Sequence, residues 1–437
     1  MPWYAAAAVL IGPIVAMMAL GVPVALAFMA TNIIGTLIFV GGLGGLLQVV
    51  DNATALVTTF QLAPVPLFIL MGSLFFFSGL AARVFDALDK LLGRVPGRLC
   101  FLTVAGGATF STMTGSSMAN TAMLGSLMLP EMQRRGYNWR MSLGPILGTG
   151  GLAMIIPPSN LGVLLASVAS IDVGRLLVSG FLPGVVLALL YTGMILLQVL
   201  LDPKSAPGYD VAPSTWREKA RAVGVNILPM SVVVFMVVGF IVLGIATPSE
   251  AAAFGVLGVL AMAAVYRLLS WAAIRNSLAA SVRVGAMVFF IIMNSSVFSQ
   301  LIAHSGASQG LLGWATSFDI PVTAMLLCIF AVLLVLGMFM DPVSMILIAV
   351  PIFMPIVHAL KVDPVWFGLF VLLALEMSQT TPPFGLLLYI MLGVAPKGTT
   401  LYQVAAAAAP FLLCDAILVA LLMAFPGIAL YLPRLMW

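Results

Sequence analysis

Charged side chains are scarce in this sequence. Asp, Glu, Lys and Arg make up only 7% of the 437 residues, whereas a soluble globular domain carries about 25%. The chain has two histidines and three cysteines, and no two cysteines stand in a CxxC spacing. Neither a disulfide framework nor a zinc site is therefore indicated. In so apolar a chain the net charge of +4 belongs to loops at a membrane surface, and we expect no nucleic-acid partner.

Apolar residues are abundant instead. They make up 62% of the chain and recur in stretches of about 20 residues, the length of a helix that crosses the hydrocarbon core of a bilayer. These runs lack the alternation of polar and apolar residues that marks membrane β-barrel strands. The sequence thus predicts an all-α polytopic membrane protein in a lipid bilayer. Residues 5–20 are expected to be a first span and not a cleaved signal, because no basic region precedes them.

One pattern of helix breakers occurs twice along the chain. A proline near the start, a glycine-containing tip, a proline beyond the tip and a Pro-Pro pair recur in the same order at a nearly constant offset. The matching positions are Pro23 and Pro248, Gly115 and Gly337, Pro130 and Pro351, and Pro157-Pro158 and Pro382-Pro383. Breaks at corresponding places in two apolar halves are the best sequence pointer to the binding site of a secondary transporter.

The repeat defines the expected domains. A first repeat covers residues 1–201, a cytoplasmic linker 202–222, and a second repeat 223–437. Each repeat is expected to hold scaffold spans (5–80 and 224–303), a re-entrant helical hairpin (99–132 and 321–358) and a broken span (141–168 and 364–393). Short interfacial helices are expected at 44–58 and 268–283. Each repeat crosses the membrane an odd number of times, so the second must lie inverted relative to the first.

Basic residues predict the orientation of the chain. With the N-terminus outside, all Lys and Arg except Arg175, Lys361 and Arg434 fall on the inner side, as the positive-inside rule requires. Arg98 and Arg134 flank the first hairpin, which is therefore expected to open from the cytoplasm. The segment 303–319 before the second hairpin has no Lys or Arg, so that hairpin is expected to open from outside.

The first tip and the first break are rich in neutral oxygen atoms. The tip supplies side-chain oxygens from Ser116, Ser117, Asn120 and Thr121. The break at 157–160 frees backbone carbonyls, because proline lacks the N–H donor. Lipid cannot satisfy exposed backbone groups, so such breaks survive where they line a cavity or bind an ion. Neutral oxygens of this kind suit Na⁺, and the glycines at 150–151 permit a close backbone approach nearby.

The second tip contains an acid. Asp341 lies in the break at 337–344, where an ionisable residue is costly and functional by default. It either ligates a cation or orients the tip. The partner break at 378–383 adds hydroxyls and freed carbonyls. Glu376, just before that break, is either a proton or cation site or is paired within the helix bundle.

The helix starts that follow each tip are expected to hold an anionic substrate. Their unpaired N–H groups carry partial positive charge, and no basic residue is predicted at the membrane midplane. The expected substrate contacts are Ser116, Asn120, Thr121, Asn160, Ser344 and Pro383. Helix packing is the alternative role for any single residue among these. The recurrence of the breaks at constant spacing favours binding for the set.

Several segments resemble a known family. Resemblance to the large membrane subunit of TRAP (tripartite ATP-independent periplasmic) transporters runs in family order from about residue 20 to 425. It is carried by Gly115-Ser116-Ser117-Met118-Ala119-Asn120-Thr121, Ile155-Ile156-Pro157-Pro158-Ser159, Gly180-Phe181-Leu182-Pro183-Gly184, Ala246-Thr247-Pro248-Ser249-Glu250 and Thr381-Pro382-Pro383-Phe384-Gly385.

The resemblance implies an ion-transporter-type elevator fold in the bacterial inner membrane, with both termini periplasmic, and Na⁺-driven uptake of a small organic acid. It implies two partners, a separate small four-span membrane subunit and a periplasmic substrate-binding protein. Family cation sites for Na⁺ lie at the hairpin tips and helix breaks, here Ser116, Ser117, Asn120, Pro157, Ser159, Gly337, Asp341, Thr380 and Thr381. Asn120 departs from the family pattern, since many relatives have a small aliphatic or hydroxyl residue there.

Three other functions are alternatives to this one. A stand-alone Na⁺- or H⁺-coupled carboxylate transporter would need no binding protein. An intramembrane hydrolase is disfavoured because the chain has no HExxH, no GxSxG and no His in a predicted midplane break. A passive channel is disfavoured because two opposed closed hairpins suit alternating access better than a continuous pore. The sequence therefore predicts a transporter subunit and not an enzyme.

Overall fold

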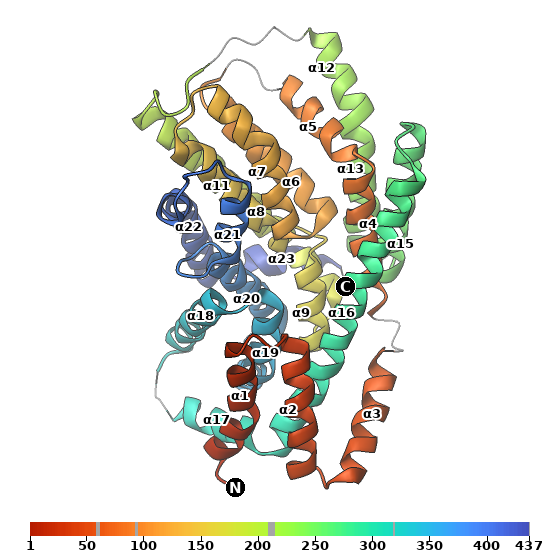
Figure 1. Ribbon diagram of the computed structural model, residues 1–437, viewed down its shortest axis with the longest axis vertical. Coiled ribbons are helices and arrows are strands. Elements are labelled where there is room, and N and C mark those ends of the chain that lie inside the picture. Colours follow the sequence, from red (N-terminus) through yellow and green to blue (C-terminus); the bar gives the residue numbers. More distant parts are fainter. Residues whose placement is uncertain (58–61, 92–94, 209–214, 318–319, 437) are drawn as a thin grey trace.

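The computed structural model describes residues 1–57, 62–91, 95–208, 215–317 and 320–436. Within these ranges all regular secondary structure is helical (Figure 1). Seven of the described helices are long and apolar enough to cross a membrane, or up to nine if two bent pairs each count as one span. The all-α polytopic architecture is confirmed. Residues 58–61 of the predicted scaffold and 209–214 of the predicted linker lie outside the described ranges.

The N-terminal helices gather at one end of the long axis. They are α1 (Trp3–Ala19), α2 (Val24–Phe39) and α3 (Leu43–Val57) (Figure 1). The next pair, α4 (Pro64–Phe77) and α5 (Leu80–Leu91), is bent by 66°. The bend falls at Gly79, whose φ of +81° favours glycine. One face of α5 is apolar and buried, so this short helix lies along the bundle and does not extend α4.

The first predicted hairpin is a pair of packed helices, α6 (Arg98–Thr114) and α7 (Ser117–Arg134). The chain reverses at Gly115, which has a φ of +54°. Ser116 then begins α7, because its hydroxyl accepts a hydrogen bond of 3.4 Å from the backbone N–H of Ala119. A single glycine and a capping serine therefore make the tip.

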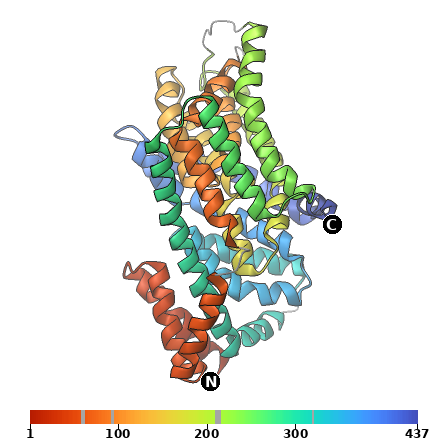
Figure 2. The ribbon, with the colours of Figure 1, turned by 90° about the vertical axis from the view of Figure 1, so that its right-hand side faces the viewer.

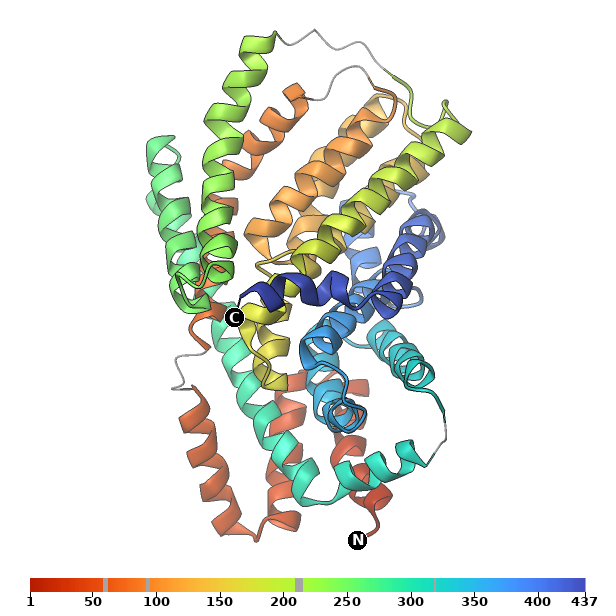
Figure 3. The ribbon, with the colours of Figure 1, turned by 180° about the vertical axis from the view of Figure 1, so that it is seen from behind.

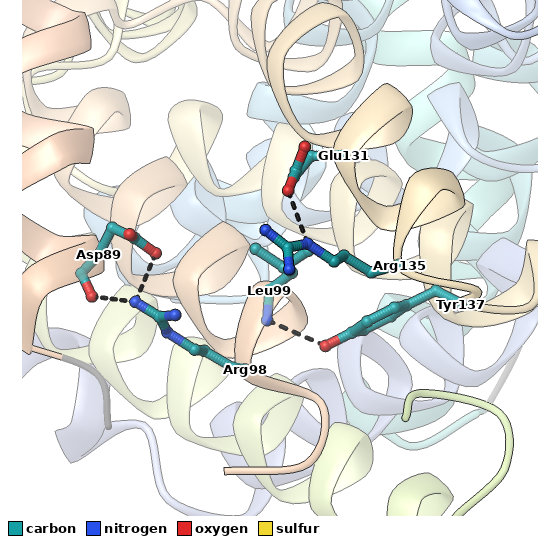
Figure 4. A network of polar contacts seen from close by, with 6 residues as sticks. All are labelled: Asp89, Arg98, Leu99, Glu131, Arg135 and Tyr137. Carbon is teal, nitrogen blue, oxygen red and sulfur yellow. Dashed lines mark hydrogen bonds and ion pairs between the residues drawn. The ribbon is translucent and has the colours of Figure 1, made fainter. Parts of the chain in front are cut away.

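Polar contacts hold the open end of this hairpin (Figure 4). The backbone N–H of Leu99, at the start of α6, donates to the hydroxyl of Tyr137, just beyond the end of α7, at 3.4 Å. Arg98 forms an ion pair of 2.8 Å with Asp89 of α5. The chain thus enters and leaves the hairpin at adjacent points, as a re-entrant element requires.

The first broken helix follows. Its parts are α8 (Trp139–Ile155) and α9 (Asn160–Ala169), bent by 41° at the intervening residues. A cis peptide joins Pro157 and Pro158 in the break. Ser159 caps α9 by accepting a 3.0 Å hydrogen bond from the N–H of Gly162. Helices α10 (Val173–Ser179) and α11 (Phe181–Leu201) complete this half.

The second half begins earlier than the sequence predicted. Helices α12 (Trp216–Ala222), α13 (Leu228–Val234) and α14 (Phe240–Val242) form one continuous segment from Trp216 to Val242. Two π-helical turns join them. Its start is fixed by a capping box between Thr215 and Glu218. The last part of the expected linker is therefore helical. The next helix, α15 (Pro248–Val265), also starts with a capping box, formed by Thr247 and Glu250.

The prediction of a separate interfacial helix at 268–283 is wrong. Residues Trp271–His304 form one 34-residue helix, α16, which starts at the cap Ser270. No proline interrupts this stretch, so the helix continues across the junction expected near residue 283. Figure 2 shows α16 running between the N-terminal helices and α4 with α15. Helix α17 (Ala307–Thr316) follows it.

The second half repeats the hairpin and the broken helix. Helices α18 (Val322–Phe339) and α19 (Pro342–Ala359) form the hairpin. Helices α20 (Pro364–Gln379) and α21 (Leu386–Val394) flank a break that again contains a cis Pro-Pro peptide. The chain ends with α22 (Leu401–Ala424) and α23 (Gly427–Leu435), and α23 packs on α10 and α11 near the middle of the molecule (Figure 3).

The two halves meet around contacts between equivalent positions. Tyr191 bonds to Asp415 across a sequence separation of 224 residues, and Gln379 contacts Met154 across 225. The Pro-Pro pairs are separated by the same interval. When a two-fold rotation relates two repeats, equivalent residues can touch each other only near the rotation axis. We therefore infer that α8, α11, α20 and α22 surround a pseudo-two-fold axis between the halves. Each hairpin also packs on the far half, α7 against α21 and α19 against α9.

Candidate cation and substrate site

The first tip lies directly on the first break. The backbone N–H of Asn160 donates to the carbonyl of Gly115 at 3.3 Å, and its side-chain amide donates to the carbonyl of Thr114 at 3.3 Å. A Cβ atom on Gly115 would come within 2.5 Å of the carbonyl oxygen of Pro158. Only glycine permits this approach, so the recurring glycine of the tip has a packing reason as well as a conformational one.

Buried oxygen atoms without a hydrogen-bond partner occur on α7 and α8, the helices behind this tip. They are Ser117 Oγ, Asn120 Oδ1, Thr121 Oγ1 and Thr149 Oγ1. Asn120 is fully buried and is held by its amide group, which donates to Ser111 Oγ at 2.9 Å and to the carbonyl of Thr149 at 3.2 Å. An unpartnered buried oxygen is unfavourable by about 1–3 kcal/mol. Neutral oxygens in such a cluster suit a monovalent cation.

Close packing of α6 and α7 on α8 places two of these threonines against glycines. A Cβ atom on Gly150 would lie 1.9 Å from Thr121 Oγ1, and one on Gly107 would lie 2.2 Å from the methyl group of Thr149. Both glycines therefore make room for a threonine of the neighbouring helix. Among the described residues no group of three or more His, Cys, Asp or Glu could hold a metal ion. The centre behind the first tip is thus built from uncharged oxygens.

A cavity of about 670 Å³ opens on the other side of the first tip, within the range of small-molecule sites. Its lining includes Ser116 and Asn160 from the tip and break, and Ser73 and Phe76 from α4. Two of the predicted substrate contacts therefore face a space large enough for a small organic molecule. Gly72 of α4 touches the tip itself, because a Cβ atom there would lie 2.7 Å from the carbonyl oxygen of Met113.

The acid of the second tip caps a helix. Asp341 Oδ2 accepts from the N–H groups of Val343 and Ser344 at 3.1 Å each, and the Ser344 hydroxyl donates to Asp341 Oδ1. Asp341 is exposed and Ser344 is fully buried. Of the two roles left open for Asp341, the orienting one is therefore visible in the geometry. The hydroxyl of Ser344, predicted to contact substrate, is engaged within the tip.

The second tip lies against the second break, as the first does. A Cβ atom on Gly337 would lie 2.2 Å from Ser378 Oγ. The hydroxyls of Thr380 and Thr381 donate to the carbonyl of Met377 at 3.1 and 2.6 Å, which leaves their oxygen lone pairs available. Pro383 is exposed.

The predicted residues fall into two groups, one at each hairpin tip and its neighbouring break. The first comprises Ser116, Ser117, Asn120, Thr121, Pro157, Ser159 and Asn160, and the second comprises Gly337, Asp341, Ser344, Thr380, Thr381 and Pro383. Both groups adjoin the four helices around the pseudo-axis.

Sequence reasoning missed the polar groups on that axis. Tyr191 and Asp415 are buried there with Glu376, and neither residue was selected from the sequence. The signal was present for Asp415, because it is a lone acid within an apolar span and so functional by default, the same argument that selected Asp341. Tyr191 carries no such signal, since a tyrosine in a span is ordinarily an interfacial anchor.

Comparison with known families matches residues 11–428 to the tripartite ATP-independent periplasmic transporter, DctM component. The chain is 30% identical to the C4-dicarboxylate TRAP transporter large permease protein DctM of Rhodobacter capsulatus, over 98% of this chain and 99% of that protein. It is 29% identical to the sialic acid TRAP transporter large permease protein SiaM of Vibrio cholerae, over 87% of each chain.

A solved structure shares the fold. The YdaH transporter of Alcanivorax borkumensis superposes with a TM-score of 0.63 at 14% identity, over 89% of this chain and 91% of that one. The family consists of transporter permeases and not of enzymes. The match covers nearly the whole chain and the helical architecture agrees with it, so the chain belongs to the DctM family of large membrane subunits of TRAP transporters.

Proposed function

We propose that this chain is the membrane subunit of a Na⁺-coupled secondary transporter of the inner membrane. It imports a small organic acid that a periplasmic binding protein delivers, and a separate small membrane subunit completes the complex. Na⁺ enters with the substrate and is cargo rather than a resident cofactor. Cation sites lie at the two hairpin tips and helix breaks.

The observation that carries the proposal is the group of four unpartnered oxygens of Ser117, Asn120, Thr121 and Thr149. They come from two helices that glycines bring into close contact, and they lie next to a break whose carbonyls are free of helical hydrogen bonds. A cation there stabilises groups that otherwise remain buried without partners. The expected charge on the substrate follows from the same site, because helix N-termini and a bound cation both favour an anion.

An elevator-type movement fits the packing between α4 and the first tip. Gly72 provides a side-chain-free contact surface on α4, facing the backbone of residues 113–114. Such a contact lets the tip slide along the scaffold without side chains interlocking. The cavity beside it holds the substrate between the moving hairpin and the scaffold. In this mechanism the hairpins, the broken helices, α11 and α22 move together.

The substrate class rests on relatives and on the site. The relatives from Rhodobacter capsulatus and Vibrio cholerae are named for C4-dicarboxylates and sialic acid, and both names denote carboxylate-bearing molecules. The cavity of about 670 Å³ accommodates either size. We therefore assign a carboxylate as the substrate class.

Reconstitution tests the proposal. Proteoliposomes that hold this chain with its small subunit are given labelled organic acids, with and without the binding protein, under an inward Na⁺ gradient or none. Accumulation that needs both Na⁺ and the binding protein is the expected result. Accumulation with Na⁺ alone would instead make the chain a stand-alone carrier, and accumulation that ignores Na⁺ would refute the cation assignment.

A further inference from the structure

The cavity beside the first tip is polar at one end and apolar over most of its remaining lining. At the tip the lining side chains are those of Ser73, Thr114, Ser116 and Asn160. Ser73 belongs to this end because it follows Gly72, the residue of α4 that touches the backbone of the tip. The rest of the lining consists of small residues and of six large apolar side chains, which are Ile69, Phe76, Phe77, Met123, Leu127 and Val284.

The cavity follows one face of α4 and one face of α7. Its lining residues run from Ile69 to Phe77 on α4 and from Ala119 to Leu127 on α7, with the spacing of three and four residues that marks a single helix face. The cavity therefore extends for about two turns, or roughly 12 Å, along each helix. The hydroxyl of Ser126, near the far end of the α7 face, donates to the carbonyl of Ala122 at 2.7 Å, so its hydrogen is not available to a ligand.

The lining carries no charge. Among the described residues that line the cavity there is no Lys, Arg, His, Asp or Glu. Arg83 of α5 follows the lining residue Ala82, but its guanidinium carbon lies over the ring of Tyr266, 4.9 Å from the ring centroid. One carboxylate can be held at the tip end by helix N-termini and a bound cation. A second carboxylate farther along the cavity would lose its water without gaining a cationic partner, which is the costliest way to bury a charge.

Hydroxyl groups on a substrate would meet a similar penalty. Each would give up hydrogen bonds to water and find mainly the side chains of Phe76, Phe77 and Met123 in their place. The rings of Phe76 and Phe77 lie edge to face with their centroids 5.2 Å apart, and both are partly exposed. They form a joint apolar surface that a ring or a branched chain can cover, and the methionine adapts to either shape.

We propose that the transported acid has a single carboxylate and an apolar body, such as an aromatic ring or a branched aliphatic chain. This inference rests on the proposed function, which assigns the cavity to the substrate. The carboxylate lies at the tip end, near Ser116 and Asn160, and the apolar body packs against Phe76, Phe77 and Met123. C4-dicarboxylates and sialic acid, for which two of the relatives are named, fit this lining poorly.

Ligand-induced thermal stabilisation of the purified full chain in lipid nanodiscs tests the inference. Phenylacetate is the probe, succinate and N-acetylneuraminate are the comparison acids, and each is titrated in NaCl and in choline chloride. An apolar pocket rejects an analogue that adds one hydroxyl by about 100-fold. Since this cavity is partly open, we expect phenylacetate to bind at least about tenfold more tightly than either comparison acid. Phenylacetamide, which lacks the charge, should bind more weakly than phenylacetate.

Variants connect the preference to the apolar wall. Phe76→Ser should weaken phenylacetate binding about tenfold, because it removes one aromatic contact and its apolar area. Phe254→Ser is the matched control, since Phe254 is a partly exposed phenylalanine of α15 that does not line the cavity, and it should leave phenylacetate binding unchanged. Met123→Gln provides a second variant if Phe76→Ser does not fold.

The order of the acids and the effect of Na⁺ are separate readouts. Succinate or N-acetylneuraminate binding as tightly as phenylacetate would overturn the inference, as would an unchanged phenylacetate affinity in Phe76→Ser and Met123→Gln. Equal melting curves with and without every acid would also overturn it and would indicate that lipid chains fill the cavity. A preference for phenylacetate that is the same in choline would support the inference while contradicting Na⁺ coupling in the proposed function.

Discussion

Replacing Thr121 by valine distinguishes a cation ligand from a residue that only packs, because the substitution is expected to affect protein stability and Na⁺ binding separately. Valine keeps the branched shape that fits against Gly150 and replaces only the hydroxyl of Oγ1, which is buried without a partner, by a methyl group. If this oxygen is merely buried, its removal relieves an unfavourable group and should stabilise the protein. If it binds Na⁺, the same change should weaken Na⁺ binding.

The magnitudes make the two outcomes easy to tell apart. Removal of an unpartnered buried hydroxyl should stabilise the Na⁺-free protein by about 1–3 kcal/mol. Loss of a hydroxyl that contacts a charged group removes about 1.5–3 kcal/mol of interaction, which corresponds to an increase of about 10- to 150-fold in half-saturating Na⁺. We therefore expect Thr121→Val to be more stable than the wild type without Na⁺ and to need far more Na⁺ for uptake.

The assay is uptake into proteoliposomes as a function of Na⁺ concentration, with thermal unfolding of the same protein in choline. Thr103→Val is the matched control. Thr103 is equally buried on α6, but its hydroxyl donates to the carbonyl of Leu99 at 2.7 Å, so its loss should leave half-saturating Na⁺ unchanged. An unchanged Na⁺ requirement in Thr121→Val, together with higher stability, would refute the ligand role and leave packing as the explanation.

Three further predictions concern the scaffold contact, the second tip and the ion itself. Gly72→Leu should reduce uptake at least tenfold with normal membrane insertion, because its Cβ would meet the backbone of the first tip at 2.7–3.0 Å; normal uptake would exclude a close sliding contact. Asp341→Asn retains a side chain that caps helices as well as aspartate does, so thermal stability should change little, and an unchanged half-saturating Na⁺ would show that the charge has only an orienting role. Replacing Na⁺ by choline should lower the melting temperature of the purified protein, since a ligand at 100 times its Kd stabilises by about 2.7 kcal/mol, and equal melting curves would contradict specific Na⁺ binding.

Local sequence patterns predicted the elements well wherever a breaker or a cap marks the chain. Gly115 and Pro157-Pro158 fall at the first tip and the first break, and Thr247 with Glu250 forms a capping box at the start of α15. Where no breaker exists, the pattern misled. The stretch Trp271–His304 changes from amphipathic to apolar character without a proline, and it is one continuous helix.

The site divides in a similar way. Hydroxyls and amides next to a break could be selected from their spacing alone, and Ser117, Asn120 and Thr121 do lie together behind the first tip. Thr149 joins them only because Gly107 and Gly150 let three helices approach closely. A contact of that kind depends on which helix faces are brought together, which no local pattern states.

The sequence by itself determined that this protein lies in a membrane, is built from two related halves and breaks its helices at matching positions. Composition decides the first, and backbone chemistry decides the others, because glycine and proline act on the chain locally. Only the tertiary structure decided which residues of the two halves meet. The pseudo-axis brings Tyr191 to Asp415 and Gly151 to Glu376, so two acids far apart in the sequence come to share one tyrosine hydroxyl.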